Sequence, residues 1–121
     1  PGMLLDGDPV LLRILLQNLL DNALKYSAPT PAPRVRVTME EEGGRRWLVF
    51  RDNGIGFGEE GPARVFEPFH RLANARGVQG TGIGLATVRH IVERHRGIVR
   101  AEQVPGGGAC FRAWLPAAGA T

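Results

Sequence analysis

Two asparagines and one lysine near the N-terminus are spaced so that a helix would place all three side chains on one stripe of its surface. Asn18 and Asn22 are four residues apart, and Lys25 is three residues further on. The same stripe begins with leucine and isoleucine, so the two amides lie where burial is expected and need partners. Amide oxygens can coordinate a hard cation while the lysine contacts an anion. The alternative is that both asparagines cap nearby backbone.

A second group of candidates surrounds an aspartate at the end of an alternating segment. Asp52 has the same alternation parity as Leu48 and Phe50, so its carboxylate should point to the covered side of a sheet. A carboxylate there needs a donor, and the exocyclic amino group of a base could supply it. Gly54 and Gly56 would let the backbone approach such a ring closely. An ordinary Asp-Asn-Gly turn is the alternative.

A third motif, Gly-Thr-Gly-Ile-Gly-Leu, opens a predicted helix. Its glycines, Gly80, Gly82 and Gly84, would expose backbone N–H groups and the positive end of the helix dipole to a phosphate. Tight entry into the helix is the alternative, and the spacing is not that of a P-loop. A G-x-G-x-x-G pattern also begins at Gly56, but no parallel strand follows within a ~30-residue unit, which argues against a dinucleotide-binding fold.

The sequence Phe-Glu-Pro-Phe-His-Arg occupies residues 66–71, between these motifs. Its phenylalanines predict a short helix seated on the core, and Arg71 could bind a phosphate with two parallel hydrogen bonds. The following stretch, 73–77, has no large apolar residue, which favours a mobile lid or a plain surface loop. The three histidines do not have the spacing of a metal-ligand set.

Composition narrows the class of protein. A chain of 121 residues with 43% hydrophobic positions fits one soluble domain, and eight of its 17 glycines fall in 54–84. The net charge of +3, without a basic run, argues against a nucleic-acid partner. There is no apolar run of about 20 residues and no signal peptide pattern. Cys110 is the sole cysteine, which excludes an internal disulfide and favours a reducing, cytoplasmic setting.

The elements that must position these motifs follow from periodicity. Asp8 as N-cap and Pro9 at the first position predict a helix over 8–27, and a second helix is expected over 84–96 with Gly97 as its C-cap. The first helix should bury one broad apolar face: Leu12, Leu16, Leu19, Leu20 and Ala23. Alternation predicts one hairpin of strands 34–40 and 46–52 with a loop of about five residues, and another of strands 98–103 and 109–115.

These elements predict an α/β fold of one domain. We expect a two-layer α/β sandwich, in which about three helices cover one face of a mixed, mostly antiparallel sheet. Its core should span about 6–116, with a loose tail at 117–121.

The order of the motifs resembles that of a known family. The chain runs through N-x-x-x-N-A-L-K-Y-S, D-N-G-I-G-F, F-E-P-F-H-R and G-T-G-I-G-L. These are similar to the N, G1, F and G2 boxes of the catalytic ATP-binding domain of sensor histidine kinases. That family also includes gyrase, the ninety-kilodalton heat-shock chaperones and the mismatch-repair ATPases. The resemblance covers about residues 6–116 and implies the Bergerat-type ATP-binding fold.

The resemblance implies a role for each matching residue. Asn22 would be the Mg²⁺ ligand and Asn18 a neighbour of metal and phosphates, while Lys25 would contact phosphate and Tyr26 would lie beside the nucleotide. In the remaining boxes, Asp52 would accept a hydrogen bond from the adenine amino group and Arg71 would lie near the γ-phosphate. The other implied nucleotide-binding residues are Gly54, Gly56, Gly80, Thr81, Gly82, Gly84 and Leu85. Asn18, Lys25 and Arg71 would be the catalytic residues.

Asn18 favours one branch of the family. The ATP-hydrolysing branches place a glutamate at this position, and an amide cannot activate water as a base. The resemblance therefore implies phosphoryl transfer from ATP to a histidine on a dimerisation domain, with a response regulator downstream. No H-E-x-x-x-P context for an acceptor histidine occurs here, so the isolated domain should be a monomer that needs its acceptor domain. A serine kinase of the anti-sigma type and a regulatory nucleotide-binding module are the alternatives.

Overall fold

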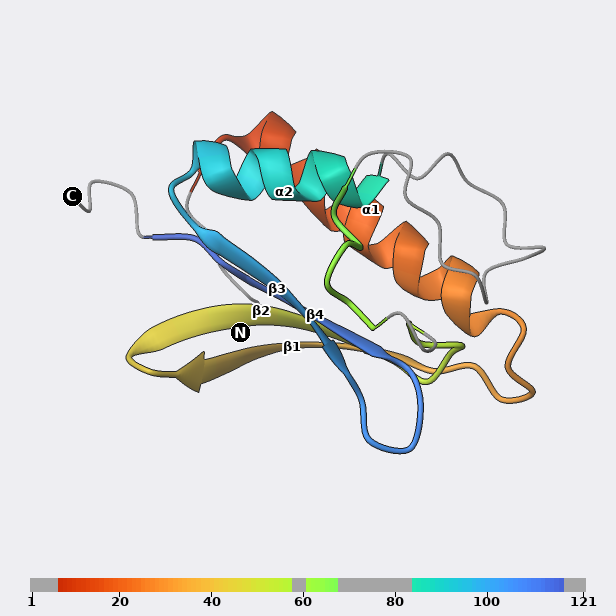
Figure 1. The fold of residues 1–121 in the computed structure, drawn as a ribbon. Coiled ribbons are helices and arrows are strands. Elements are labelled where there is room, and N and C mark those ends of the chain that lie inside the picture. The colour runs from red at the N-terminus through yellow and green to blue at the C-terminus, as the bar shows by residue number, and fades with distance from the viewer. Residues whose placement is uncertain (1–6, 58–60, 68–83, 117–121) are drawn as a thin grey trace.

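The computed structural model of the chain describes residues 7–57, 61–67 and 84–116 (Figure 1). The elements in chain order are α1 (Pro9–Ser27), β1 (Val35–Glu42), β2 (Arg45–Asp52), α2 (Gly84–Arg94), β3 (Ile98–Gln103) and β4 (Ala109–Trp114). The expected lid and the expected tail at 117–121 lie outside the described residues, as do Arg71, Gly80, Thr81 and Gly82.

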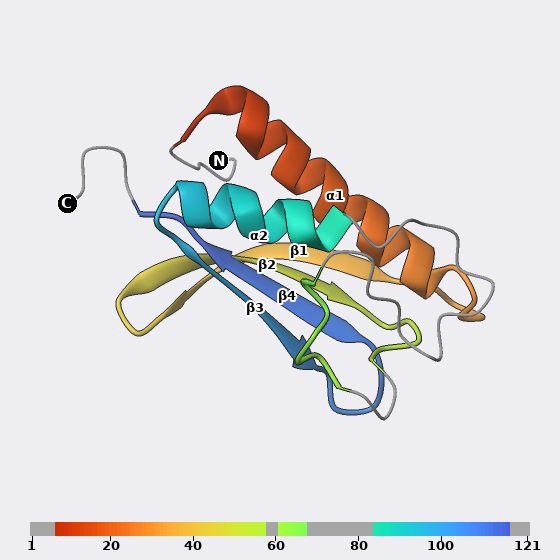
Figure 2. The same cartoon turned by 45° about the horizontal axis from the view of Figure 1, so that its top comes forward.

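Two layers make up the fold, as the sequence predicts. The four strands form one sheet in the order β1-β2-β4-β3, and α1 and α2 lie side by side on one face of it (Figure 2). Each strand pair within the described ranges is antiparallel, and this part of the chain contains two α-helices. In the same part of the chain, neither helix is long and apolar enough to cross a membrane.

The first hairpin is tighter than expected. Its strands continue to Glu42 and Arg45, so the loop consists of Gly43 and Gly44 rather than about five residues. Both glycines have positive φ angles, 61° and 77°, which are required at the two central positions of a type I′ turn. The glycine pair therefore allows the pairing to extend to the end of the hairpin.

Helix α1 begins as predicted and buries three of the five residues of the expected face, Leu12, Leu19 and Ala23. Asp8 caps it, with Oδ1 accepting from two backbone N–H groups of the first turn. The buried residues are Leu12, Leu15, Leu19, Ala23 and Ser27. The expectation that Leu16 and Leu20 are buried is wrong, because their side chains are 37% and 39% exposed. The side chain of Asn18 faces the start of α2. Leu16 and Leu20 each lie about 160° around the helix axis from Asn18, and so point away from α2.

The end of α2 corrects a second expectation. The residue in the left-handed conformation is Arg96, with a φ of 60°, and not Gly97. The N–H of Gly97 donates to the carbonyl of Val92, and the N–H of Arg96 donates to that of Glu93, which together form a Schellman motif. Gly97 is required for another reason, since a Cβ there would lie 2.1 Å from the carbonyl oxygen of Trp114.

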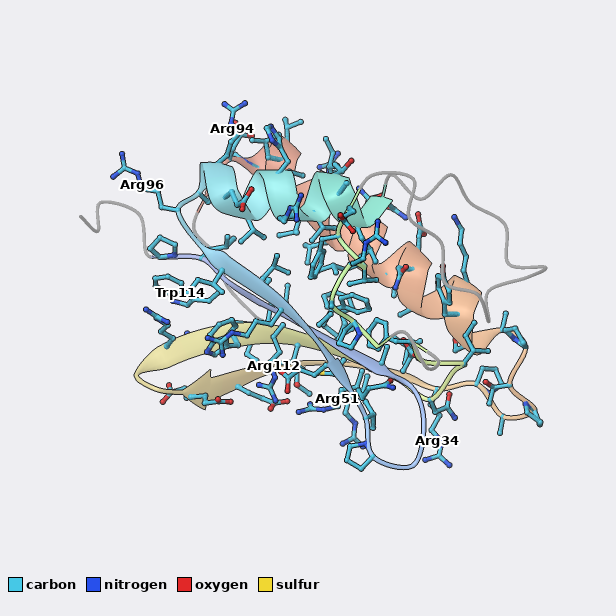
Figure 3. All side chains as sticks on the ribbon, viewed as in Figure 1. Arg34, Arg51, Arg94, Arg96, Arg112 and Trp114 are labelled. Atoms are coloured by element: carbon cyan, nitrogen blue, oxygen red, sulfur yellow. The ribbon has the colours of Figure 1, made fainter. Side chains whose placement is uncertain are left out.

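The two faces of the sheet are covered by different groups: one by the helices and the other by arginine side chains. The face under the helices carries Leu48, Phe50 and Phe111 of the main hydrophobic core. On the opposite face, a small cluster that includes Trp47 and Cys110 is buried, and neither of the two described helices lies above it. Arginine side chains cover this cluster instead. Arg45 lies 4.4 Å from the Trp114 ring centre and Arg100 lies 5.0 Å from that of Trp47. Arg51 and Arg112, which Figure 3 labels, both pair with Glu40.

Candidate functional site

Asp52 is buried at the point where the two hairpins meet. Its side chain lies on the covered face, as its parity predicts, and the residue is 5% exposed. The carboxylate Oδ1 accepts from the N–H of Gly54 at 2.9 Å and from the N–H of Ala109 at 3.3 Å. Asp52 therefore joins the end of β2 to the start of β4.

The environment of Asp52 disfavours its charged form. Burial raises the pKa of its carboxyl above the ordinary value, and the hydrogen bonds from Gly54 and Ala109 offset only part of that rise. Within the described residues both hydrogen bonds end on Oδ1, which leaves Oδ2 available for an outside donor. A neutral amino group is a suitable donor for a buried carboxylate of this kind.

The turn after Asp52 packs against the end of α1. A Cβ on Gly54 would lie 2.1 Å from the carbonyl oxygen of Tyr26, and the N–H of Ile55 donates to that same oxygen at 3.1 Å. The close approach that the structure shows at Gly54 is therefore to protein backbone. Gly56 has a φ of 65°, a conformation that favours glycine.

A small cavity connects the predicted motifs. Its volume is about 20 Å³, and it is lined by Asn22, Tyr26, Gly56, Phe57, Val65, Leu85, Ala109 and Phe111. Four of these residues were predicted from the sequence, on α1, the turn and the start of α2. Ala109 also donates to Asp52, so the cavity adjoins the buried carboxylate. This volume holds about one water molecule, so a purine would enter only if the lining moves apart.

Three apolar residues of this lining, Phe57, Val65 and Phe111, were given no role in the site from the sequence. Phe57 and Phe111 meet edge to face with ring centres 5.7 Å apart, and Val65 is buried in the same core. Phe57 follows the glycine motif directly, which is a signal that could have been used. Val65 and Phe111 have no local signal, because only the packing of three separate segments brings them here.

Asn18 and Asn22 line the side of α1 that faces this region. The Nδ2 of Asn18 donates to the carbonyl of Ile14 at 3.0 Å, so the amide does bond to nearby backbone. Its Oδ1 faces the first residue of α2, since a Cβ on Gly84 would lie 3.2 Å from it. The structure thus brings the first asparagine motif to the last glycine of the third motif.

Lys25 is exposed in the last turn of α1, and the described part of the chain gives it no ion pair. The predicted phosphate-binding residues Arg71, Gly80, Thr81 and Gly82 lie outside the described residues. Among the described residues, no group of three His, Cys, Asp or Glu side chains could hold a metal ion. The side-chain amides that α1 brings to this region are those of Asn18 and Asn22.

Comparison with known proteins agrees with this geometry. A family profile described as histidine kinase-, DNA gyrase B-, and HSP90-like ATPase matches residues 7–119. The circadian input-output histidine kinase CikA of Synechococcus elongatus is 39% identical over 91% of this chain, and the sensor-like histidine kinase SenX3 of Mycolicibacterium smegmatis is 37% identical over 91%. The chain spans only 15% and 29% of these two relatives.

Solved structures show the same relationship. The mycobacterial sensor histidine kinase MprB superposes with a TM-score of 0.80 at 35% identity, over 91% of this chain and 74% of that one. The histidine kinase domain of the E. coli osmosensor EnvZ gives 0.61 at 33% identity, over 93% and 68%. The chain therefore belongs to the family of histidine kinase-, DNA gyrase B- and HSP90-like ATPases, as an ATP-binding domain of the sensor histidine kinase type.

Proposed function

We propose that this domain binds ATP with Mg²⁺ and transfers the γ-phosphoryl group to a histidine on a dimerisation domain of the same parent protein. The observation that carries the proposal is the buried Asp52, which is hydrogen-bonded to Ala109 in the lining of a cavity that Asn22 and Tyr26 also line. A buried acceptor at one end and an amide stripe on α1 match the two ends of an adenine nucleotide.

Adenine recognition would depend on Oδ2 of Asp52, the carboxylate oxygen that has no hydrogen bond within the described residues. Its Oδ1 is held by Gly54 and Ala109, which fixes the direction of Oδ2. Oδ2 would accept a hydrogen bond from the exocyclic amino group of the base, while Tyr26, Gly56 and the apolar lining would contact the ring. A guanine carbonyl at the same place would face the carboxylate acceptor to acceptor, so the site should discriminate against guanine.

The phosphate end would be formed by α1 and the start of α2. The amide oxygens of Asn22 and Asn18 would suit a hard cation, because the Nδ2 of Asn18 is already bonded to Ile14 and its Oδ1 faces Gly84 at the start of α2. Asn22 would hold Mg²⁺, which neutralises phosphate charge when bound. Lys25 and Arg71 would supply further positive charge.

Transfer rather than hydrolysis follows from the chemistry of Asn18. A neutral amide near the phosphates positions ligands but removes no proton from water. The G2 residues Gly80, Thr81, Gly82, Gly84 and Leu85 would present backbone N–H groups and cover the phosphates. Gly54 and Gly56 would shape the adenine end. The chain's own contribution is therefore positioning and charge stabilisation.

The partners in this proposal are the histidine-bearing domain of the parent protein and, downstream, a response regulator. The core over 6–116 would act as a monomeric unit, without nucleic acid and without direct membrane contact. A cytoplasmic location belongs to the proposal, because ATP is supplied there and the buried thiol of Cys110 is unpaired within the described residues.

Phosphotransfer to a separately produced dimerisation domain tests the proposal. The domain is mixed with the acceptor, Mg²⁺ and γ-labelled ATP, and the label on the acceptor is followed. We expect a phosphoryl group that is lost in acid and kept in base, as a phosphohistidine is. The Glu93→Gln variant, which removes an exposed charge on α2, serves as the matched control and should transfer at the parent rate.

Other outcomes are informative. Label that is stable in acid and lost in base would mean a phosphoserine and would refute histidine transfer. ATP binding without transfer to any acceptor would refute kinase activity and leave a nucleotide-binding module. Release of inorganic phosphate in place of transfer would contradict the role given to Asn18.

A further inference from the structure

Asn53, between the buried aspartate and the first glycine of its motif, ties this turn to another part of the chain. Its Nδ2 donates to the carbonyl of Ala32 at 2.8 Å, and its Oδ1 accepts from the N–H of Arg34 at 2.7 Å. Its own N–H donates to the carbonyl of Arg34 at 3.3 Å. The hydroxyl of Thr30 donates to the Asn53 carbonyl at 3.4 Å.

The chemistry of these contacts is specific to asparagine. One partner is a backbone carbonyl, which only accepts, and the other is a backbone N–H, which only donates. A primary amide offers an NH₂ group that donates and a carbonyl oxygen that accepts, both at the end of a short side chain. Aspartate at position 53 would face the carbonyl of Ala32 with a second acceptor, and serine is too short to span both partners. The two partners also fix which end of the amide points where.

The connection that Asn53 holds has little else to fix it. Residues 28–34 link α1 to β1, and every one of them except the half-exposed Thr30 is exposed. None of them belongs to the hydrophobic core of the described residues. Hydrogen bonds to residue 53 therefore account for much of the attachment of this connection to the turn.

The turn is held on its other side as well. The N–H of Ile55 donates to the carbonyl of Tyr26 at the end of α1. Residues 52–55 are thus clamped between the last turn of α1 and the connection that follows it. The direction of the Asp52 carboxylate, whose Oδ1 is bonded to Gly54 and Ala109, depends on the backbone on both sides of it keeping this geometry.

We propose that Asn53 is a positioning residue for adenine nucleotide binding, which acts through Asp52 by holding the 52–55 turn against residues 32–34. This inference rests on the proposed role of Asp52 in adenine recognition. Loss of the two side-chain bonds leaves the core intact but lets the turn sample other conformations. The apparent affinity then falls by the fraction of time in which Asp52 is correctly aimed.

A double-mutant cycle on ADP binding tests this inference. The dissociation constant is measured by titration calorimetry for the parent domain, Asp52→Asn, Asn53→Ala and the double variant. We expect Asn53→Ala to weaken binding by roughly five- to tenfold. In the Asp52→Asn background the same change should weaken it by less than about twofold, because there is no longer a carboxylate to aim.

Two further variants separate positioning from loss of fold. Asn53→Ser removes the amide but keeps a turn-forming residue, so it should lower affinity as Asn53→Ala does while leaving the melting temperature near that of the parent. Gln17→Ala removes an exposed side-chain amide on α1 that bonds only to Asp21 within the described chain, and should change neither quantity. The ratio of ADP affinities with and without Mg²⁺ should stay constant in Asn53→Ala, since the effect lies at the adenine end.

The outcomes distinguish this inference from the proposed function. If Asp52→Asn binds ADP as tightly as the parent, the assignment of adenine recognition fails and the inference fails with it. If Asp52→Asn weakens binding but Asn53→Ala and Asn53→Ser do not, only the inference is overturned. Equal losses from Asn53→Ala in both backgrounds would also overturn it, because the residue would then act independently of Asp52.

Discussion

Replacing Asp52 by asparagine should weaken nucleotide binding without lowering the stability of the fold. The amide keeps the shape of the carboxyl and an oxygen that can accept from Gly54 and Ala109, so the junction of the two hairpins is retained. The raised pKa of Asp52 means that its ionised form costs more in the folded than in the unfolded state. The neutral amide avoids this cost, so Asp52→Asn should unfold at the same temperature as the parent or higher.

The same change should weaken nucleotide binding. An Nδ2 at the position of Oδ2 would place a donor opposite the amino group of adenine, where the parent has a charged acceptor. A hydrogen bond to a charged group contributes about 1.5–3 kcal/mol. This corresponds to a loss of affinity of roughly 10- to 150-fold.

Two measurements on one protein sample test the prediction. Thermal unfolding followed by circular dichroism gives the stability, and calorimetric titration with ADP gives the affinity. Glu93→Gln on α2 removes one exposed negative charge and should alter neither value. The reasoning is refuted if Asp52→Asn keeps the parent affinity, or if it loses affinity only because it unfolds at a lower temperature.

Three other predictions concern the metal, a helix end and an ion pair. Asn22→Ala should abolish most of the gain in ATP affinity that Mg²⁺ provides, while ATP binding without metal stays unchanged. Titrations with and without EDTA measure both affinities. If the gain from Mg²⁺ is unaltered, Asn22 is not a metal ligand. At the end of α2, Arg96→Gly should stabilise the fold by up to ~1 kcal/mol because it relieves a left-handed φ, whereas Gly97→Ala should destabilise it by more than ~2 kcal/mol through collision with a β4 carbonyl. Chemical denaturation reports both, and equal effects would contradict the assignment of the Schellman motif. Hydrogen bonding to Arg51 lowers the pKa of Glu40 from 4.5 to about 2. The pair therefore stabilises the fold above pH 4.5, and this contribution is lost as the pH falls toward 2. The Glu40→Gln variant should lose stability less steeply in acid than the parent does, and an unchanged dependence of stability on pH would refute this.

The secondary structure was predictable because each element has a local signal. Asp8 and Pro9 mark the start of α1, alternation marks the first half of β1, and glycine-containing loops separate β1 from β2 and β3 from β4. Asp52 was placed on the covered face by parity alone, and its burial confirms this. These features depend only on backbone period and on the chemistry of helix ends.

The predictions from sequence were wrong where contacts between distant segments determine which side chain is buried or which residue must be glycine. Leucines surround much of α1, so periodicity indicates an apolar helix but not that Leu16 and Leu20 lie on the flank away from α2. Gly97 was taken for the left-handed residue, whereas its lack of a side chain is required by the close approach of β4. Both cases depend on neighbours that are distant in sequence.

The residues of the candidate site also fall into two groups, those with a local sequence motif and those brought in by packing alone. Asn22, Tyr26 and Leu85 lie in recognisable motifs, and the structure brings them to one cavity. Val65 and Phe111 reach this cavity only through packing. The bonds of Asn53 to the connection before β1 likewise have no counterpart in local sequence, since that connection lacks any regular pattern.

The bond between Asp52 and Ala109 has a consequence for synthesis of the chain. The two residues are 57 positions apart, and Ala109 opens the last strand. A nascent chain on the ribosome cannot complete the proposed adenine site until β4 has emerged and paired with β2. Because a ligand stabilises only the state that binds it, nucleotide cannot assist the folding of any shorter piece. Ligand-dependent resistance to proteolysis should therefore appear in a single step, when the end of the domain leaves the ribosomal tunnel.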